Sequence, residues 1–147
     1  MMTTSSISYQ PYGIALLRIS LGIMFIAHSV LLKLLTFGLP GTSAFFHSVG
    51  LPGPLAYVTF AAEAIGGVLL VLGIGTRFVV PALTPFLAGA IVFVHFGNGW
   101  VFSAPGGGWE YPAFLLVASV AQALLGDGAF ALSQHFDRGH DLGQRTA

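Results

Sequence analysis

The sequence contains no cysteine, which excludes disulfide bonds, thiolate metal ligands and thiol catalysis by this chain. Charged residues are also scarce, at 7% of the chain, whereas soluble domains carry about 25%. So few charges do not cover a water-facing surface. Together with a mean hydropathy of +0.86, this scarcity predicts an integral membrane protein whose main partner is the lipid bilayer. The net charge of zero indicates no nucleic-acid binding, which needs a basic face.

Four apolar runs are long enough to shape the fold. A helix of about 20 apolar residues crosses the hydrocarbon core of a bilayer, and the fourth run is shorter than that. The runs predict an all-α, integral membrane four-helix bundle, in which residues 13–132 form one domain between a polar N-terminal segment (1–12) and a polar C-terminal tail (133–147). The expected transmembrane helices cover residues 13–35, 55–74, 78–97 and 111–126.

The first connecting loop predicts a short helix of its own. Gly and Pro bracket residues 38–54, and inside the loop Phe45, Phe46 and Val49 fall on one helical face. An amphipathic segment of this kind is typical of a helix that lies on the membrane surface.

The distribution of Lys and Arg predicts the orientation of the bundle. With four spans, both termini share one side of the membrane with Arg77, Arg138 and Arg145, while Lys33 stands alone on the other side. Positive residues favour the cytoplasmic side. We therefore expect a multi-pass protein of the bacterial plasma (inner) membrane with both termini in the cytoplasm. The N-terminus lacks the pattern of a cleavable signal peptide, so the first helix is expected to serve as its own insertion signal.

Titratable residues inside apolar runs are the main functional clue, because such residues are costly in a membrane and usually mark a site. Depths estimated at ~1.5 Å per residue place His28, Glu63 and His95 in the outer half of the bundle. We predict a polar pocket there, whereas no metal site and no particular catalytic residue are predicted. The pocket's candidate residues are His28, Lys33, Glu63, His95, Asn98 and Glu110.

Glu63 is the centre of this hypothesis. Its helical neighbours Thr59, Gly66 and Gly67 mark a face that packs closely against another helix. We therefore expect Glu63 to face inward and to pair with a cation of the first helix. By depth, both Arg18 and His28 are within reach; an Arg18–Glu63 pair would be a structural ion pair that staples two helices.

The sequence resembles the DoxX family of small four-helix membrane proteins over about residues 12–132. The motifs that carry the resemblance are "LLRISLGIMFIAHSVLLKL" (16–34), "GTSAFFHSVGLPGPLAYVTFAAEAIGGVLLVLGIGTRF" (41–78), "HFGNGW" (95–100) and "WEYP" (109–112). Ser29 and Leu32 depart from the Gly and Gln that are frequent at these positions in the family. The resemblance implies a membrane protein with respiratory or redox functions, several of whose relatives are described as oxidoreductases.

Three classes of function stay open. The first is a redox component that binds quinone or another small molecule, either as an enzyme or as part of an oxidoreductase. The second is a non-catalytic partner or assembly subunit that contacts other membrane or redox proteins, or forms a homo-oligomer. The third, favoured least, is a haem carrier with His28 and His95 as axial ligands. No dinucleotide fingerprint or phosphate loop is present.

Overall fold

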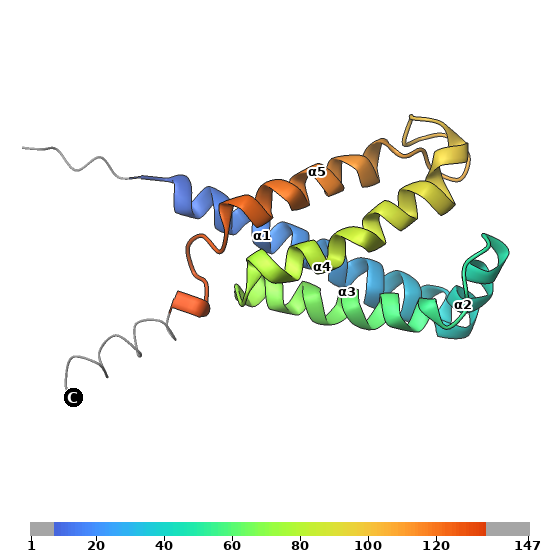
Figure 1. Ribbon diagram of the computed structural model, residues 1–147, viewed down its shortest axis with the longest axis horizontal. Coiled ribbons are helices and arrows are strands. Elements are labelled where there is room, and N and C mark those ends of the chain that lie inside the picture. Colours follow the sequence, from blue (N-terminus) through green and yellow to red (C-terminus); the bar gives the residue numbers. More distant parts are fainter. Residues whose placement is uncertain (1–7, 135–147) are drawn as a thin grey trace, which may run out of the picture.

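The computed structural model describes residues 8–134, and this part of the chain is helical, without a strand. The predicted tail and its Arg138 and Arg145 lie outside the described residues, as do residues 1–7. The elements, in chain order, are α1 (Gln10–Ile26), η1 (Ala27–Thr36), α2 (Gly38–Ser48), α3 (Leu55–Leu72), α4 (Thr76–Gly89), η2 (Ala90–His95), η3 (Phe96–Asn98) and α5 (Glu110–Leu125) (Figure 1).

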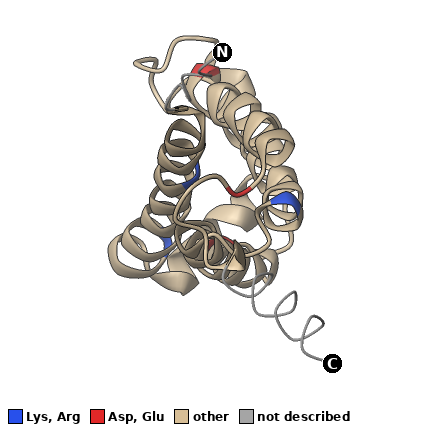
Figure 2. Cartoon of the chain, turned by 90° about the vertical axis from the view of Figure 1, so that its left-hand side faces the viewer, with Lys and Arg blue, Asp and Glu red and all other residues tan. Residues whose placement is uncertain are grey.

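Three helical stretches are long and apolar enough to cross a membrane. They are Gln10–Thr36, Leu55–Leu72 and Thr76–Asn98, with 27, 18 and 23 residues, and α5 is a shorter apolar helix of 16 residues. The first stretch starts three residues before the expected position 13, since Pro11 fits the first turn of a helix, where an N–H is not needed. Charged residues occupy few places along these helices (Figure 2).

The helices pack as two antiparallel pairs, α1 with α3 and α4 with α5. Glycines allow the first pair to come very close: a Cβ atom added to Gly22 would lie 2.8 Å from the carbonyl oxygen of Gly67, and the reverse distance is also 2.8 Å. The turn between α3 and α4 contains Gly73 and Gly75, both at positive φ, where a residue with a side chain would be strained. This tight turn makes α3 and α4 antiparallel neighbours.

The two ends of the molecule differ in how tightly they pack. One end, here called the terminal end, carries the start of α1, the turn at 73–75 and the segment 126–134; the other, the loop end, carries α2 and the loop 99–109. The two helix pairs meet at the terminal end and diverge toward the loop end (Figure 1). Accordingly η2 has no buried residue and η1 has only Ser29. The buried apolar core contains Leu21, Phe25, Leu70, Val80, Leu83, Leu115 and Ala118.

Two stretches near the loop end are π-helical, which the sequence did not predict. In η1 the hydrogen bonds reach back five residues, as between the Phe37 N–H and the Leu32 carbonyl at 3.0 Å. The second π-helical stretch, η2, follows two prolines inside α4. Single π-turns are frequent at functional sites, and here these stretches carry three of the predicted site residues: His28, Lys33 and His95.

Candidate functional site

Glu63 is buried and its partner is Lys33, with 2.5 Å between Lys33 Nζ and Glu63 Oε2. The prediction of an inward-facing, paired Glu63 therefore holds, but the partner is neither Arg18 nor His28. Side chains on a helix lean toward its N-terminus. The two helices α1–η1 and α3 are antiparallel. The Lys33 side chain therefore leans toward the terminal end and the Glu63 side chain toward the loop end, so that the two side chains meet. Depths estimated from the positions of Cα atoms along the helix do not include this lean of the side chains.

Arg18 leans away from Glu63, toward the terminal end, and the predicted Arg18–Glu63 ion pair is wrong. Its guanidinium is fully buried and donates to four backbone carbonyls. Nη1 donates to Leu70 (2.5 Å) and Val71 (3.0 Å) in the last turn of α3; Nε donates to Asp127 (2.7 Å) and Nη2 to Ala129 (3.0 Å). A cation at a helix C-terminus is favoured by the unpaired carbonyls there. Arg18 thus ties α1 and α3 to the segment after α5.

Asp127 completes this cluster at the terminal end. Its carboxylate accepts hydrogen bonds from the Thr76 N–H at the start of α4 (3.2 Å) and from the Ser133 hydroxyl (2.6 Å). Burial by itself raises the pKa of Asp127, but the bonds from Ser133 and Thr76 and the nearby Arg18 charge outweigh burial and hold the pKa below its usual value. Through its carboxylate and its carbonyl, Asp127 links α1, the start of α4 and the segment after α5, a role that the sequence did not predict.

At the loop end, three of the six predicted pocket residues bind the loop 99–109 instead of lining a common cavity. His95 Nδ1 lies 2.9 Å from the Gly107 carbonyl oxygen, and Asn98 Nδ2 donates to the carbonyls of Gly106 and Gly107, both at 3.0 Å. Glu110 Oε1 accepts from the Phe102 N–H at 2.7 Å. These contacts give a glycine-rich loop a fixed shape.

His28 lies against α5. Its Nδ1 is 3.0 Å from the Met24 carbonyl oxygen, and its ring is stacked on Tyr111 with 6.4 Å between centroids and 24° between planes. The Tyr111 hydroxyl donates to the sulfur of the same Met24. Tyr111 therefore crosses from α5 to α1, and with His28 it closes the seam between the two helix pairs.

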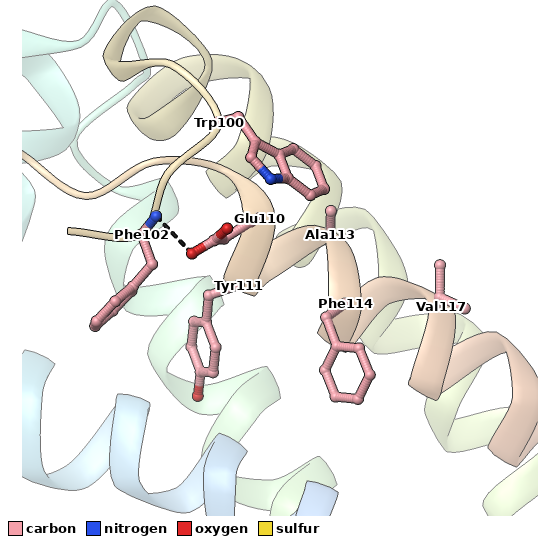
Figure 3. A pocket seen from close by; sticks show the side chains of 7 residues that line it. All are labelled: Trp100, Phe102, Glu110, Tyr111, Ala113, Phe114 and Val117. Carbon is pink, nitrogen blue, oxygen red and sulfur yellow. Dashed lines mark hydrogen bonds between the residues drawn. The ribbon is translucent and has the colours of Figure 1, made fainter. Parts of the chain in front are cut away.

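Beside this seam the surface is hollowed into an open groove of about 920 Å³ (Figure 3). The groove lies between the loop and α5, with Trp100 and Glu110 at one end and Val117 at the other. Four of its seven lining residues are aromatic. Its residues are Trp100, Phe102, Glu110, Tyr111, Ala113, Phe114 and Val117.

Of the predicted site residues, only Glu110 lines the groove, and His28 stacks directly behind its wall at Tyr111. Lys33 and Glu63 satisfy each other, and His95 and Asn98 are engaged with the loop. The aromatic side chains were missed, although the spacing 110, 113, 114 and 117 marks one face of a helix beside a loop with two Trp. Within residues 8–134, no cluster of three or more His, Asp or Glu side chains is arranged to hold a metal ion.

Comparison with known proteins identifies the family. The model of the family described as DoxX matches residues 13–96. The chain belongs to the DoxX family. It is 38% identical over 135 residues to a Bacillus subtilis protein named "Putative oxidoreductase CatD", which covers 92% of this chain and 95% of that protein. It is also 32% identical over 129 residues to an uncharacterized protein of Haemophilus influenzae, covering 87% and 93% of the two chains. No solved structure matches it.

The family match includes the residues that hold the bundle together. The glycine contact of α1 with α3, Arg18 and the Lys33–Glu63 pair all fall within residues 13–96. The groove residues follow this stretch, within the last third of the chain. The segment that matches the DoxX model therefore contains the contacts that hold α1 and α3 together, while α5 and the loop before it form the groove.

Proposed function

We propose that this DoxX protein is a membrane-bound redox component that binds a quinone or a similar aromatic, lipid-soluble carrier in the groove along α5. The observation that carries the proposal is the aromatic lining of the groove at the loop end. A relative named as a putative oxidoreductase supports a redox role. With no cysteine in the chain, a bound carrier is a direct source of electron-transfer chemistry.

The groove has the polarity of an amphiphile with a ring at one end. It extends from Glu110 to Val117, which is roughly 10 Å along a helix. At the Glu110 end, Trp100 Nε1 and Glu110 Oε2 take part in no hydrogen bond with any described residue. The indole N–H can donate to a ring oxygen, whereas the carboxylate oxygen can only accept from a ring hydroxyl. At the other end, Phe114 and Val117 offer only apolar surface to an isoprenoid tail. Trp, Phe and Tyr rings favour a planar aromatic head group through stacking.

The charge of the groove favours an uncharged head group over a phospholipid. Its single carboxylic acid is Glu110, and no Lys or Arg is among the lining residues. The phosphate of a lipid would face this carboxylate without a compensating cation, and like charges in a low-dielectric setting repel strongly. A quinone carries no charge, so it avoids this penalty.

The membrane setting of the proposal follows the sequence prediction. The four helical stretches would form a four-helix bundle in the bacterial plasma membrane, with both termini in the cytoplasm and the loop end outward. Helix α2 would lie in the interface, where Thr42 ties it to η1 by a bond to the Lys33 carbonyl at 3.1 Å. α5 is short for a full span, and the adjoining loop would fill the remaining depth beside the groove.

The haem alternative receives less support from the geometry. A haem carrier would need His28 and His95 on the two faces of one iron, whereas His28 stacks on Tyr111 and His95 is held against Gly107. An assembly subunit would use its lipid-facing surface for a partner protein. Absorbance of the purified protein in the visible range tests the haem alternative directly.

The test of the proposed function is binding of a short-chain benzoquinone to the purified protein in lipid nanodiscs, followed by quenching of tryptophan fluorescence. Phe114→Ala should weaken binding because it removes one wall of the groove. Leu124→Ala is the matched control: Leu124 is 76% exposed and Phe114 69%, both on α5, but Leu124 lies outside the groove. Equal affinity of the two variants, or no saturable quenching in the wild type, would contradict the proposal.

A further inference from the structure

The end of the groove near Glu110 is held in shape by the loop before α5. The Glu110 N–H donates to the Trp100 carbonyl at 3.0 Å, and the Phe102 N–H donates to Glu110 Oε1 at 2.7 Å. The Trp100 ring packs edge-on against Trp109, with 4.4 Å between the ring centroids. The Glu110 carboxylate and the Trp100 indole are therefore neighbours, and each is held by a contact of its own.

Each of these two lining residues keeps one polar side-chain atom without a partner. Trp100 Nε1 and Glu110 Oε2 make no hydrogen bond with a described residue, nor with each other. In Figure 3 the indole nitrogen lies on the side of its ring that faces Glu110, and the free carboxylate oxygen lies on the side that faces Trp100. An indole N–H only donates, and a carboxylate oxygen only accepts. The groove thus presents a donor and an acceptor next to each other.

We infer that one ring hydroxyl of the bound carrier bridges these two atoms, accepting from Trp100 Nε1 and donating to Glu110 Oε2, so that the groove prefers a quinol to a quinone. This inference rests on the proposed function. A hydroxyl has a proton and lone pairs, so it satisfies both groups at once. A quinone oxygen accepts from the indole but faces the carboxylate oxygen without a proton between them. One net hydrogen bond in an open groove corresponds to a preference of roughly 3- to 10-fold in affinity.

The decisive variant is Glu110→Gln, which exchanges the free acceptor for a donor. The Phe102 N–H needs an acceptor, so the amide oxygen takes the position of Oε1 and the amide nitrogen takes that of Oε2. A quinone oxygen then accepts from both the indole and the amide. We therefore expect Glu110→Gln to bind the quinone roughly 3- to 10-fold more tightly than the wild type does, and to lose the preference for the quinol. A gain in affinity does not result from damage to the fold.

Two control variants separate Glu110 from its neighbours in the groove. Trp100→Phe removes an N–H that donates to the oxygen of either form, so it should weaken quinol and quinone binding by a similar factor and keep the preference. Tyr111→Phe removes the other polar group of the lining, a hydroxyl that already donates to the Met24 sulfur. It should also keep the preference, because the bridge does not include this hydroxyl.

The experiment measures the affinities of a short-chain benzoquinone and its benzoquinol by anaerobic titration calorimetry of the protein in nanodiscs, with empty nanodiscs as the blank. The dimethyl ether of the quinol has the same ring but no O–H, and the wild type should bind it no more tightly than the quinone. This comparison uses the wild type alone, so it does not depend on how variants fold. Equal wild-type affinity for quinol and quinone, or a preference for the quinol that survives in Glu110→Gln, would overturn the bridge and leave the proposed function standing. Saturable binding of neither form would overturn both.

Discussion

Replacing Arg18 by Met tests whether this side chain holds the terminal end together. The carbonyls of Val71, Asp127 and Ala129 take no other hydrogen bond among the described residues, while Leu70 keeps a bond from Gly73. Three partly buried carbonyls would therefore lose their partner, at about 1–3 kcal/mol each if they were fully buried. Because water can enter at an end of the bundle, the lower part of this range applies, and we expect a loss of about 3–4 kcal/mol in the free energy of unfolding.

The control for this prediction is Arg77→Met. Arg77 is an exposed arginine at the same end, and it donates no hydrogen bond to a described residue. Its replacement should change stability by less than about 0.5 kcal/mol. Arg18→Lys should fall between the two, because an ammonium keeps the charge but does not span carbonyls on both α3 and the segment 126–134.

The assay is reversible unfolding in mixed micelles by increasing fractions of sodium dodecyl sulfate, combined with hydrogen exchange. Exchange adds a local readout: the amides of Ala129 and Leu132, which bond Pro11 and Leu72 across the cluster, should exchange faster in Arg18→Met. Amides at the glycine contact of α1 with α3 should change only with global stability. If Arg18→Met and Arg77→Met unfold at the same fraction of sodium dodecyl sulfate, the Arg18 guanidinium does not stabilise the terminal end as its contacts indicate.

Three further predictions use the same unfolding assay. Gly67→Ala should cost about 1–3 kcal/mol, since its Cβ would meet backbone atoms of α1, whereas Gly89→Ala, with open space at Cβ, should not destabilise. Glu63→Gln should cost about 3–5 kcal/mol by leaving Lys33 unpaired, and adding Lys33→Met should recover part of that loss. The folded protein holds the pKa of Asp127 below its ordinary value of 3.8. The ionised Asp127 therefore contributes its full stabilisation above pH 3.8, and this contribution is lost as the pH falls from 3.8 through the lower pKa of the folded state. Asp127→Asn should weaken the dependence of the free energy of unfolding on pH in this acidic range.

The helical architecture was predictable from the sequence because lipid demands long apolar helices, and little else in the chain competes with that signal. The starts and ends depended on local chemistry such as Pro11 and the glycine turn at 73–75. The π-helical stretches were not predictable, since the shift from four- to five-residue hydrogen bonding leaves no periodic mark in so uniformly apolar a sequence.

The sequence left the cationic partner of Glu63 open between Arg18 and His28, and the structure pairs Glu63 with Lys33 instead. Sequence depth placed Glu63, His28 and Arg18 by the level of their Cα atoms, but a long side chain reaches several ångströms toward its own helix N-terminus. That lean brings Lys33 to Glu63 and carries Arg18 in the opposite direction. Depth also gave no sign that His95 and Asn98 would bind a loop that follows them in the chain.

The sequence did not predict the groove, because a site prediction based on titratable residues does not include aromatic side chains. Aromatic rings such as Trp100 are common at a membrane interface, so the residue type alone does not mark a site. Only the folded loop brings Trp100 and Phe102 onto the face of α5 that carries Tyr111 and Phe114. That loop is held by Glu110, whose second carboxylate oxygen remains free.

The open side of the groove determines how a carrier would enter and leave it. One face of the groove is open to its surroundings, so a bound ring is covered by protein on one side only, and its affinity would depend on few contacts. A carrier dissolved in the bilayer would reach such a surface laterally and leave it by the same path. Because the tight packing is at the terminal end, entry at the loop end requires no opening of the core around Leu70 and Val80. This arrangement would suit exchange of the proposed carrier with a pool dissolved in the bilayer.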